Sequence, residues 1–195
     1  MAKIAHIYML CERFQSFSMK QFTFSFLLFF GLNVTAQQSI SNITGKFAEV
    51  ERGRYSLSYP NTWTLDTSKV MGMDLLLRSP RFDSLDNFIE NLNVFVQDLH
   101  GQGYNLLKMG RESENQIKSM VTDVEIIDSQ IDSTSSPICY KLKYKGRHGK
   151  FNLISEQRYY LKDEVGFALT FTVQDGKEQM YSLDVKRIFD SFKLL

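Results

Sequence analysis

The sequence predicts an α+β domain organised around an antiparallel sheet. In the stretch 136–173, apolar and polar residues alternate in three successive runs, which is the two-residue period of half-buried strands. Gly146 and Gly149 form the first break and a short polar segment forms the second, so the runs predict a meander with tight turns. Apolar residues recur at helical spacing in 105–121 and again from Met180 onward, which supplies helices to cover the sheet.

Shorter strands are predicted before the meander. Tyr55–Tyr59 alternates with its aromatic residues on one side, and Pro60–Asn61 turns the chain into a short strand at Trp63–Leu65. Met71–Arg78 is a mixed apolar run, and Asn91–Val96 alternates again. Both of these segments are therefore predicted to be strands.

The remaining segments complete a single domain. Residues 37–52 contain scattered apolar positions without a sustained period, so we predict a lead-in segment there and a single domain over 53–195. A further strand is predicted at 124–131, directly after the first helix. Asp175 is followed three positions later by Glu178, which is the spacing of a capping box, so we predict that the last helix begins before Met180.

Trp63 is the only tryptophan of the chain, and we predict that it lies in the core. A buried indole usually packs among apolar side chains while its N–H group donates to a carbonyl. The apolar face of the last meander strand, formed by Phe167, Leu169 and Phe171, is its expected neighbour.

The first residues have the pattern of a secretory signal peptide. A basic residue precedes the apolar run Phe22–Val34, and small residues at the end of this run suit signal peptidase. The run is shorter than the roughly twenty apolar residues of a membrane-spanning helix. We therefore expect 1–36 to be an N-terminal extension with a signal peptide that is cleaved after Ala36, and a secreted or periplasmic mature protein without a membrane span. Met1 or Met19 can be the start, and an N-terminal membrane anchor is the alternative.

The charges of the chain are nearly balanced. The whole chain has 23 basic and 22 acidic residues, and 1–36 holds three of the former and one of the latter, which leaves 20 basic and 21 acidic residues. Such a balance creates no overall field that attracts nucleic acid. We therefore expect no nucleic-acid partner, and we expect a monomer.

The sequence lacks the signatures of common catalytic and cofactor sites. A nucleophile elbow, a phosphate-binding loop and a His-Glu-x-x-His zinc motif do not occur. Asp83, Asp86 and Glu90 lie in one loop, but their spacing matches no calcium loop, so we predict solvated charges there. Cys139 lies in a strand and is predicted to be inert. We therefore assign no catalytic residue, cofactor or metal; the alternative is a hydrolase or other small-molecule enzyme whose site is assembled from distant residues.

The first strand of the meander carries the candidate partner-binding residues. Its alternation places lysines on one side, and the following turn extends the positive charge. The candidates are Lys141, Lys143, Lys145, Arg147 and Lys150. Such a face suits an envelope protein or a polyanion as partner. The alternative is a solvated face that guards against edge pairing, with Glu156 or Arg158 opposite the lysines.

The order of elements and three short motifs resemble the PsbP-like family. The motifs are Tyr59–Pro60–Asn61–Thr62–Trp63, Asn91–Leu92–Asn93–Val94 and Ser191–Phe192, within a resemblance that covers about Tyr55 to Phe192. The resemblance implies an α/β/α sandwich with a central antiparallel sheet of about six to seven strands, flanked by two or more helices.

The same family includes the photosystem II protein PsbP, the Ran-binding Mog-type proteins and small secreted bacterial proteins. This chain looks most like the secreted bacterial members. The resemblance implies a non-enzymatic binding or assembly module of the cell envelope, and it assigns no ion-binding residue.

Overall fold

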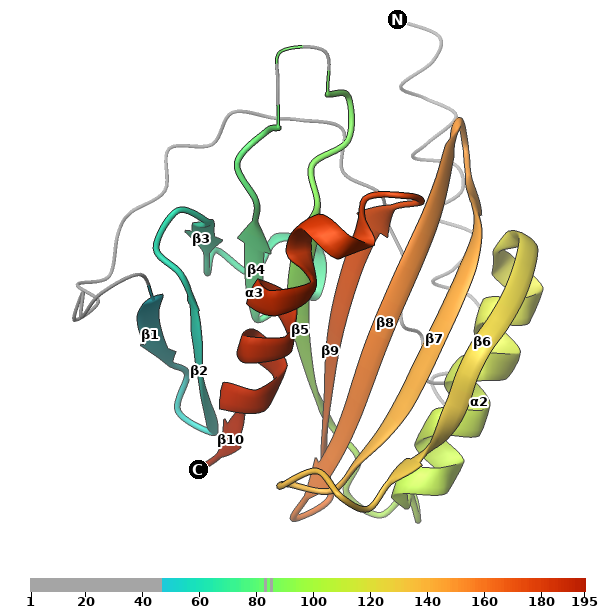
Figure 1. Cartoon of the computed structure of the whole chain (residues 1–195). Helices are drawn as coiled ribbons and strands as arrows, with labels where there is room; N and C mark the ends of the chain where they lie inside the picture. Colours follow the sequence, from blue (N-terminus) through green and yellow to red (C-terminus); the bar gives the residue numbers. More distant parts are fainter. Residues whose placement is uncertain (1–46, 83, 85) are drawn as a thin grey trace, which may run out of the picture.

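A large antiparallel sheet runs through the protein, with helices on both of its faces (Figure 1). The structure is a computed structural model that describes residues 47–82, 84 and 86–195. The strands follow the order β3-β4-β5-β9-β8-β7-β6. Their bounds are β3 Thr64–Asp66, β4 Leu75–Arg78, β5 Asn91–Asp98, β6 Thr122–Asp132, β7 Cys139–His148, β8 Phe151–Lys162 and β9 Val165–Gln174. The predicted fold class is confirmed.

A second, smaller sheet lies beside the large one. It has the order β1-β2-β10, with β1 at Phe47–Glu51, β2 at Tyr55–Pro60 and β10 at Lys193–Leu194. No element was predicted within 37–52, yet β1 forms there. Its inward-facing apolar residues are only Ala48 and Val50, which are too few to show a period in the sequence.

The strand predicted at Met71–Arg78 is shorter than expected. Strand β4 begins only at Leu75, and a 3₁₀ turn at Val70–Gly72 precedes it. Met71 has a φ of 54°, a left-handed conformation outside the extended region of a regular strand. The apolar run in the sequence therefore extends beyond the strand.

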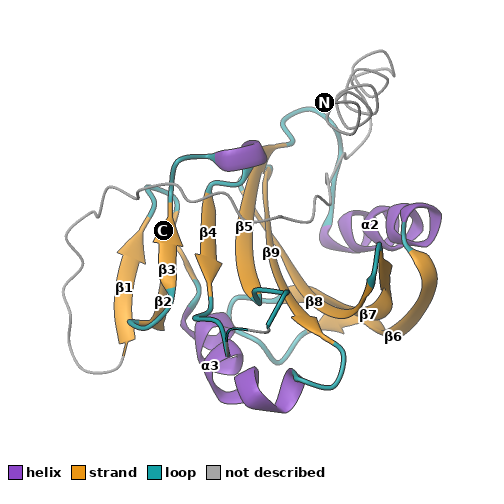
Figure 2. Cartoon of the chain, turned by 90° about the horizontal axis from the view of Figure 1, so that it is seen from above, coloured by secondary structure: helices purple, strands orange, loops and turns teal. Residues whose placement is uncertain are grey.

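The two α-helices of the described chain cover opposite faces of the large sheet (Figure 2). Helix α2 (Leu106–Met120) packs on β6, β7 and β8, and helix α3 (Glu178–Ser191) packs on β9 and β2. The side chain of Asn105 caps α2, because it accepts a hydrogen bond of 2.9 Å from the N–H group of Lys108.

The last helix begins before Met180 as predicted, but its predicted side-chain cap is wrong. The N-cap residue of α3 is Lys177, and no side chain caps this end. Asp175 instead extends the sheet, since its N–H group donates to the carbonyl of Asn152 at 2.9 Å. Gly176 then turns the chain with a φ of 87°, which glycine adopts without steric cost.

Strand alternation creates an apolar core on each face of the large sheet. On the α3 face, Phe167, Leu169 and Phe171 of β9 pack in the same core as Trp63, which confirms the predicted neighbourhood of the indole. On the α2 face, Tyr140 of β7 packs under the helix. Helix α2 approaches this ring so closely that a Cβ atom at Gly110 would overlap it, so the contact requires glycine.

The predicted signal peptide, its cleavage site after Ala36 and the alternative start at Met19 lie outside the described residues. Within the described part, neither helix combines the length and the apolar character that a bilayer crossing requires.

Helix α3 covers only part of its face of the sheet. It lies over β9 and the small sheet, whereas β7 and β6 extend past it and no described helix covers them on this side (Figure 1). The side chains that β7 projects to this side are polar from Lys141 onward, after the buried Cys139. This open part of the sheet is where the candidate residues lie.

Candidate functional site

The residues proposed for partner binding lie on β7 and in the turn after it. Lys141, Lys143, Lys145 and Arg147 occupy alternate positions of β7, so they share the α3 face of the sheet. Lys150 follows in the turn, where its ammonium group lies 5.1 Å from the centre of the Phe151 ring. We call these four β7 residues together with Lys150 the lysine face.

The lysine face is not at the edge of the sheet. Strand β7 lies between β8 and β6, and β6 forms the outer edge (Figure 1). An edge position for the lysines is therefore wrong, because the strand that precedes the meander pairs with its first strand. The expected neighbours on β8 are confirmed: Lys141 lies opposite Arg158, and Lys143 lies opposite Glu156.

Acidic residues of β6 pair with most of the lysine face. The ion pairs are Lys141 with Asp132 at 2.5 Å, Lys145 with Glu125 at 2.8 Å and Arg147 with Asp123 at 2.9 Å. The hydrogen bond from Lys141 lowers the pKa of Asp132, and the hydrogen bond to Glu125 raises the pKa of Lys145. The surface therefore has mixed charge.

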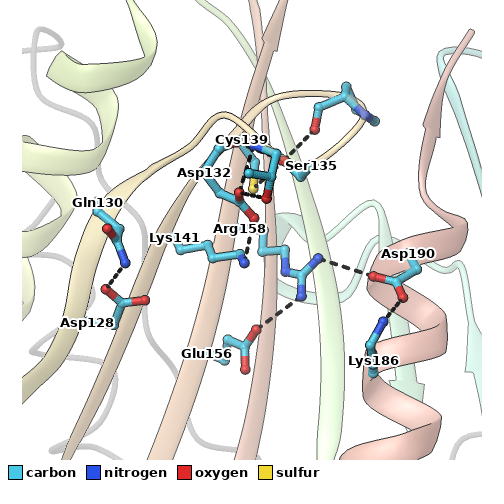
Figure 3. Close-up of polar contacts among 12 residues, drawn as sticks. Asp128, Gln130, Asp132, Ser135, Cys139, Lys141, Glu156, Arg158, Lys186 and Asp190 are labelled. Carbon is cyan, nitrogen blue, oxygen red and sulfur yellow. Dashed lines mark hydrogen bonds and ion pairs between the residues drawn. The ribbon is translucent and has the colours of Figure 1, made fainter.

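Arg158 links this surface to helix α3 (Figure 3). Its side chain is only 11% exposed, and its guanidinium carbon lies 4.2 Å from the centre of the Phe189 ring. Nη2 donates to Glu156 at 3.4 Å, and Nη1 lies 3.8 Å from the carboxylate of Asp190. The alternation of β8 indicated that Arg158 lies across from the lysines, but no local pattern indicated its contact with α3.

Cys139 is buried next to the open part of the sheet. Burial raises the pKa of its thiol, and the Ser135 hydroxyl lies 3.4 Å from the sulfur. A thiol with a raised pKa stays protonated at neutral pH and is a weak nucleophile. This environment is typical of a packing residue.

A second polar cluster lies under the loop between β4 and β5. Its carboxylates, Asp86 and Glu90, were predicted to be solvated, but their side chains are 3% and 0% exposed; Asp83 lies outside the described residues. Lys177 Nζ lies 2.9 Å from Asp86 and 3.8 Å from Glu90. Tyr181 also donates to Glu90 at 3.1 Å. The two buried carboxylates share one cation, Lys177, which is far along the sequence.

The titration behaviour of the cluster follows from these contacts. Burial by itself raises the pKa of Asp86, but the hydrogen bonds from Lys177 and from two backbone N–H groups outweigh it and lower that pKa. Burial, together with the nearby carboxylates, raises the pKa of Tyr181 to about 12. The cluster therefore holds a structural ion pair and a neutral phenol at physiological pH.

The described chain contains two histidines, His100 before α2 and His148 at the end of β7. His100 is exposed, with Nδ1 2.7 Å from Asp98, and this hydrogen bond raises its pKa. His148 ends β7 and is partly buried, which lowers its pKa. Within residues 47–82, 84 and 86–195, no three His, Cys, Asp or Glu side chains are placed to hold a metal ion.

Comparison with known proteins identifies the architecture. No protein-family model and no curated protein sequence matches the chain. Solved structures match it across most of their length. PsbP (CyanoP) of the cyanobacterium Synechocystis sp. PCC 6803 is 14% identical over 84% of this chain and 99% of its own, with a TM-score of 0.55. The chain has the PsbP/Mog-type fold.

Two further structures with this fold have functions stated in their names. The Ran-binding protein Mog1p of Saccharomyces cerevisiae is 12% identical over 80% of this chain and 96% of its own, with a TM-score of 0.53. LpqN of Mycobacterium tuberculosis, which is involved in cell envelope biogenesis, is 10% identical over 77% of this chain and 92% of its own, with a TM-score of 0.52. The predicted resemblance is thus confirmed for the fold, and at these identities it extends no further.

Proposed function

We propose that this protein is an exported binding or assembly module of the cell envelope that acts without catalysis and binds a protein partner through the lysine face. The observation that carries the proposal is the open part of the sheet beside α3, where charged side chains lie partly exposed on rigid strands. The Ran-binding Mog1p and LpqN, which is involved in cell envelope biogenesis, have the same fold, which supports a binding role.

The mixed charge of this surface favours a protein over a polyanion. Lys141, Lys145 and Arg147 each have an acidic neighbour on β6, so a polyanion would meet negative as well as positive groups. A protein surface can present charges of both signs in matching positions. We therefore propose a protein partner for this monomer, and no nucleic acid.

The chemistry of the buried groups supports binding over the enzyme alternative. Asp86 and Glu90 are enclosed and share the ammonium group of Lys177, so they are poorly placed to reach a substrate. The thiol of Cys139 has a raised pKa, which opposes its use as a nucleophile.

Removing the positive charges of the lysine face is expected to abolish partner recovery from the native envelope fraction. The variant changes Lys141, Lys143, Lys145, Arg147 and Lys150 to glutamine. Exposed substitutions usually shift the free energy of unfolding by about 0.5 kcal/mol or less each, so the variant should remain folded. Recovery by the unaltered protein should also fall as salt rises, because exposed charges are screened beyond about 8 Å at physiological ionic strength.

A matched control changes exposed lysines elsewhere on the surface. These are Lys69, Lys118, Lys162, Lys186 and Lys193, each changed to glutamine. The control should recover the partner as well as the unaltered protein does. Equal recovery by the lysine-face variant, at low and high salt alike, would assign the partner to another surface.

The proposed export and signal-peptide cleavage can be tested by mass spectrometry. The intact mass of the protein from the envelope or medium should correspond to a chain that begins at Gln37, because the signal peptide is expected to be cleaved after Ala36. A mass that still includes Met1 or Met19, in protein held by the membrane, would support the N-terminal anchor instead.

A further inference from the structure

We propose that the outer edge of β6 binds an extended segment of the partner protein, which joins the sheet as an added strand. Strand β6 ends the large sheet, and among the described residues only β7 pairs with it. The outward N–H and C=O groups of an edge strand can pair with a strand from another chain. This inference rests on the proposed binding function and specifies which kind of segment the partner supplies.

Only the C-terminal half of β6 offers a regular edge. Its pairing with β7 shifts register between Thr122 and Glu125 and again between Ile126 and Asp128, whereas Asp128–Asp132 pairs without interruption. Bulges twist an edge strand and oppose further pairing. The added strand therefore lies along Asp128–Asp132.

Charge on the α3 face of this segment selects basic residues in the added strand. Glu156 of β8, Lys143 of β7 and Asp128 of β6 lie in one row across the sheet. The sign of the charge thus alternates from strand to strand and ends at the edge on a carboxylate. Opposite charges in facing positions stabilise strand pairing. A lysine or arginine opposite Asp128 would continue the row.

A groove on the α2 face selects apolar residues at the intervening positions. It lies between α2 and β6 and has a volume of about 320 Å³. Leu107 and Ile131, which are 40% and 44% exposed, line it together with Tyr140. Arg111 and Glu114 also line the groove. Glu114 already pairs with Lys118 and accepts a hydrogen bond from Ser129, so these lining residues offer no unpaired carboxylate to a basic side chain. A segment that alternates basic and apolar residues fits both faces in one orientation.

Charge also disfavours a second copy of this chain as the occupant. If two copies paired antiparallel about Gln130, Asp128 of each would face Asp132 of the other. Like charges in facing positions destabilise strand pairing. This pairing of two copies is therefore disfavoured, and a strand of opposite charge is favoured.

A capped heptapeptide in which lysine and valine alternate between terminal threonines is the probe. Added to the isotope-labelled mature protein, it should shift the amide resonances of 128–132 and slow their hydrogen exchange. A peptide with methylated backbone nitrogens cannot donate the ladder hydrogen bonds and should not bind. A peptide with glutamate in place of lysine should bind more weakly.

Two protein variants complete the test. Asp128→Lys should weaken binding of the lysine peptide by about fivefold and strengthen binding of the glutamate peptide. Asp123→Lys, a matched charge reversal within the first register shift of the same strand, should leave the binding of both peptides unchanged. Well-dispersed spectra of each variant confirm its fold.

The outcomes separate this inference from the proposed function. If the lysine peptide does not bind, or the methylated peptide binds equally well, the edge is not the docking site; recovery of a partner through the lysine face would then leave the proposed function intact. Peptide binding with no partner recovered from the envelope would support the edge site and contradict the envelope role.

Discussion

Replacing Lys177 with methionine is expected to destabilise the protein by about 3–5 kcal/mol at neutral pH, because it leaves buried carboxylates without a cation. Asp86 and Glu90 are 3% and 0% exposed, and Lys177 Nζ lies within 4 Å of both, at 2.9 and 3.8 Å. Methionine has a similar length and fills the space, so the loss reports the missing charge rather than a cavity. Urea unfolding followed by circular dichroism measures it.

The cost of this substitution should shrink as the pH falls. In the unaltered protein the folded-state pKa of Asp86 lies below its ordinary value, so its stabilisation is present at neutral pH and is lost as the pH falls through the folded pKa. Without Lys177, the largest interaction that lowers the pKa of Asp86 is lost while its burial remains, so protonation of Asp86 relieves the penalty. The two unfolding free energies should therefore converge below about pH 4.

Two control variants separate charge from other effects. Lys177→Arg keeps the charge and should retain most of the stability. Lys186→Met removes a lysine from the exposed side of the same helix, where the side chain is 70% exposed, and should cost about 0.5 kcal/mol or less. Equal losses for Lys177→Met and Lys186→Met, or a loss independent of pH, would contradict the buried ion-pair interpretation.

The meander and the first helix could be predicted because their patterns are long and local. Strands β7 and β9 each alternate over ten residues, and α2 spans 15 residues with a side-chain cap at Asn105. Strand β1 could not be predicted, because its five residues carry their signal only at Ala48 and Val50. Strand β1 forms by pairing with β2, so its position depends on residues outside these five.

The candidate site was predictable in its positions but not in its surroundings. Alternation alone places Lys141 and Lys143 on one face, opposite Arg158 and Glu156. The pairing of the lysines with acidic residues of β6 depends on the register between β6 and β7, which shifts at two irregularities. No local pattern in the sequence encodes such shifts. The burial of Asp86 likewise depends on Lys177, 91 residues away in the chain.

Trp63→Ala is expected to cost about 3–5 kcal/mol through lost burial and a cavity in the core. The indole is 5% exposed and contacts rings from two other elements. Its ring centre lies 6.4 Å from that of Phe171 on β9 and 6.1 Å from that of Tyr181 on α3. Because the variant lacks the only tryptophan, circular dichroism rather than fluorescence should follow its unfolding in urea.

The effect of Trp63→Ala should also be coupled to that of Lys177→Met. Tyr181 contacts the indole and donates to Glu90 at 3.1 Å, so a shift of its ring changes the surroundings of the buried carboxylates. Residues that share a contact usually show non-additivity of about 0.5 kcal/mol or more. Trp63→Phe keeps an aromatic ring and should lose less stability than the alanine variant. An unchanged urea midpoint for Trp63→Ala would refute its place in the core, and strict additivity in the double variant would show that Tyr181 does not connect the core to the ion pair.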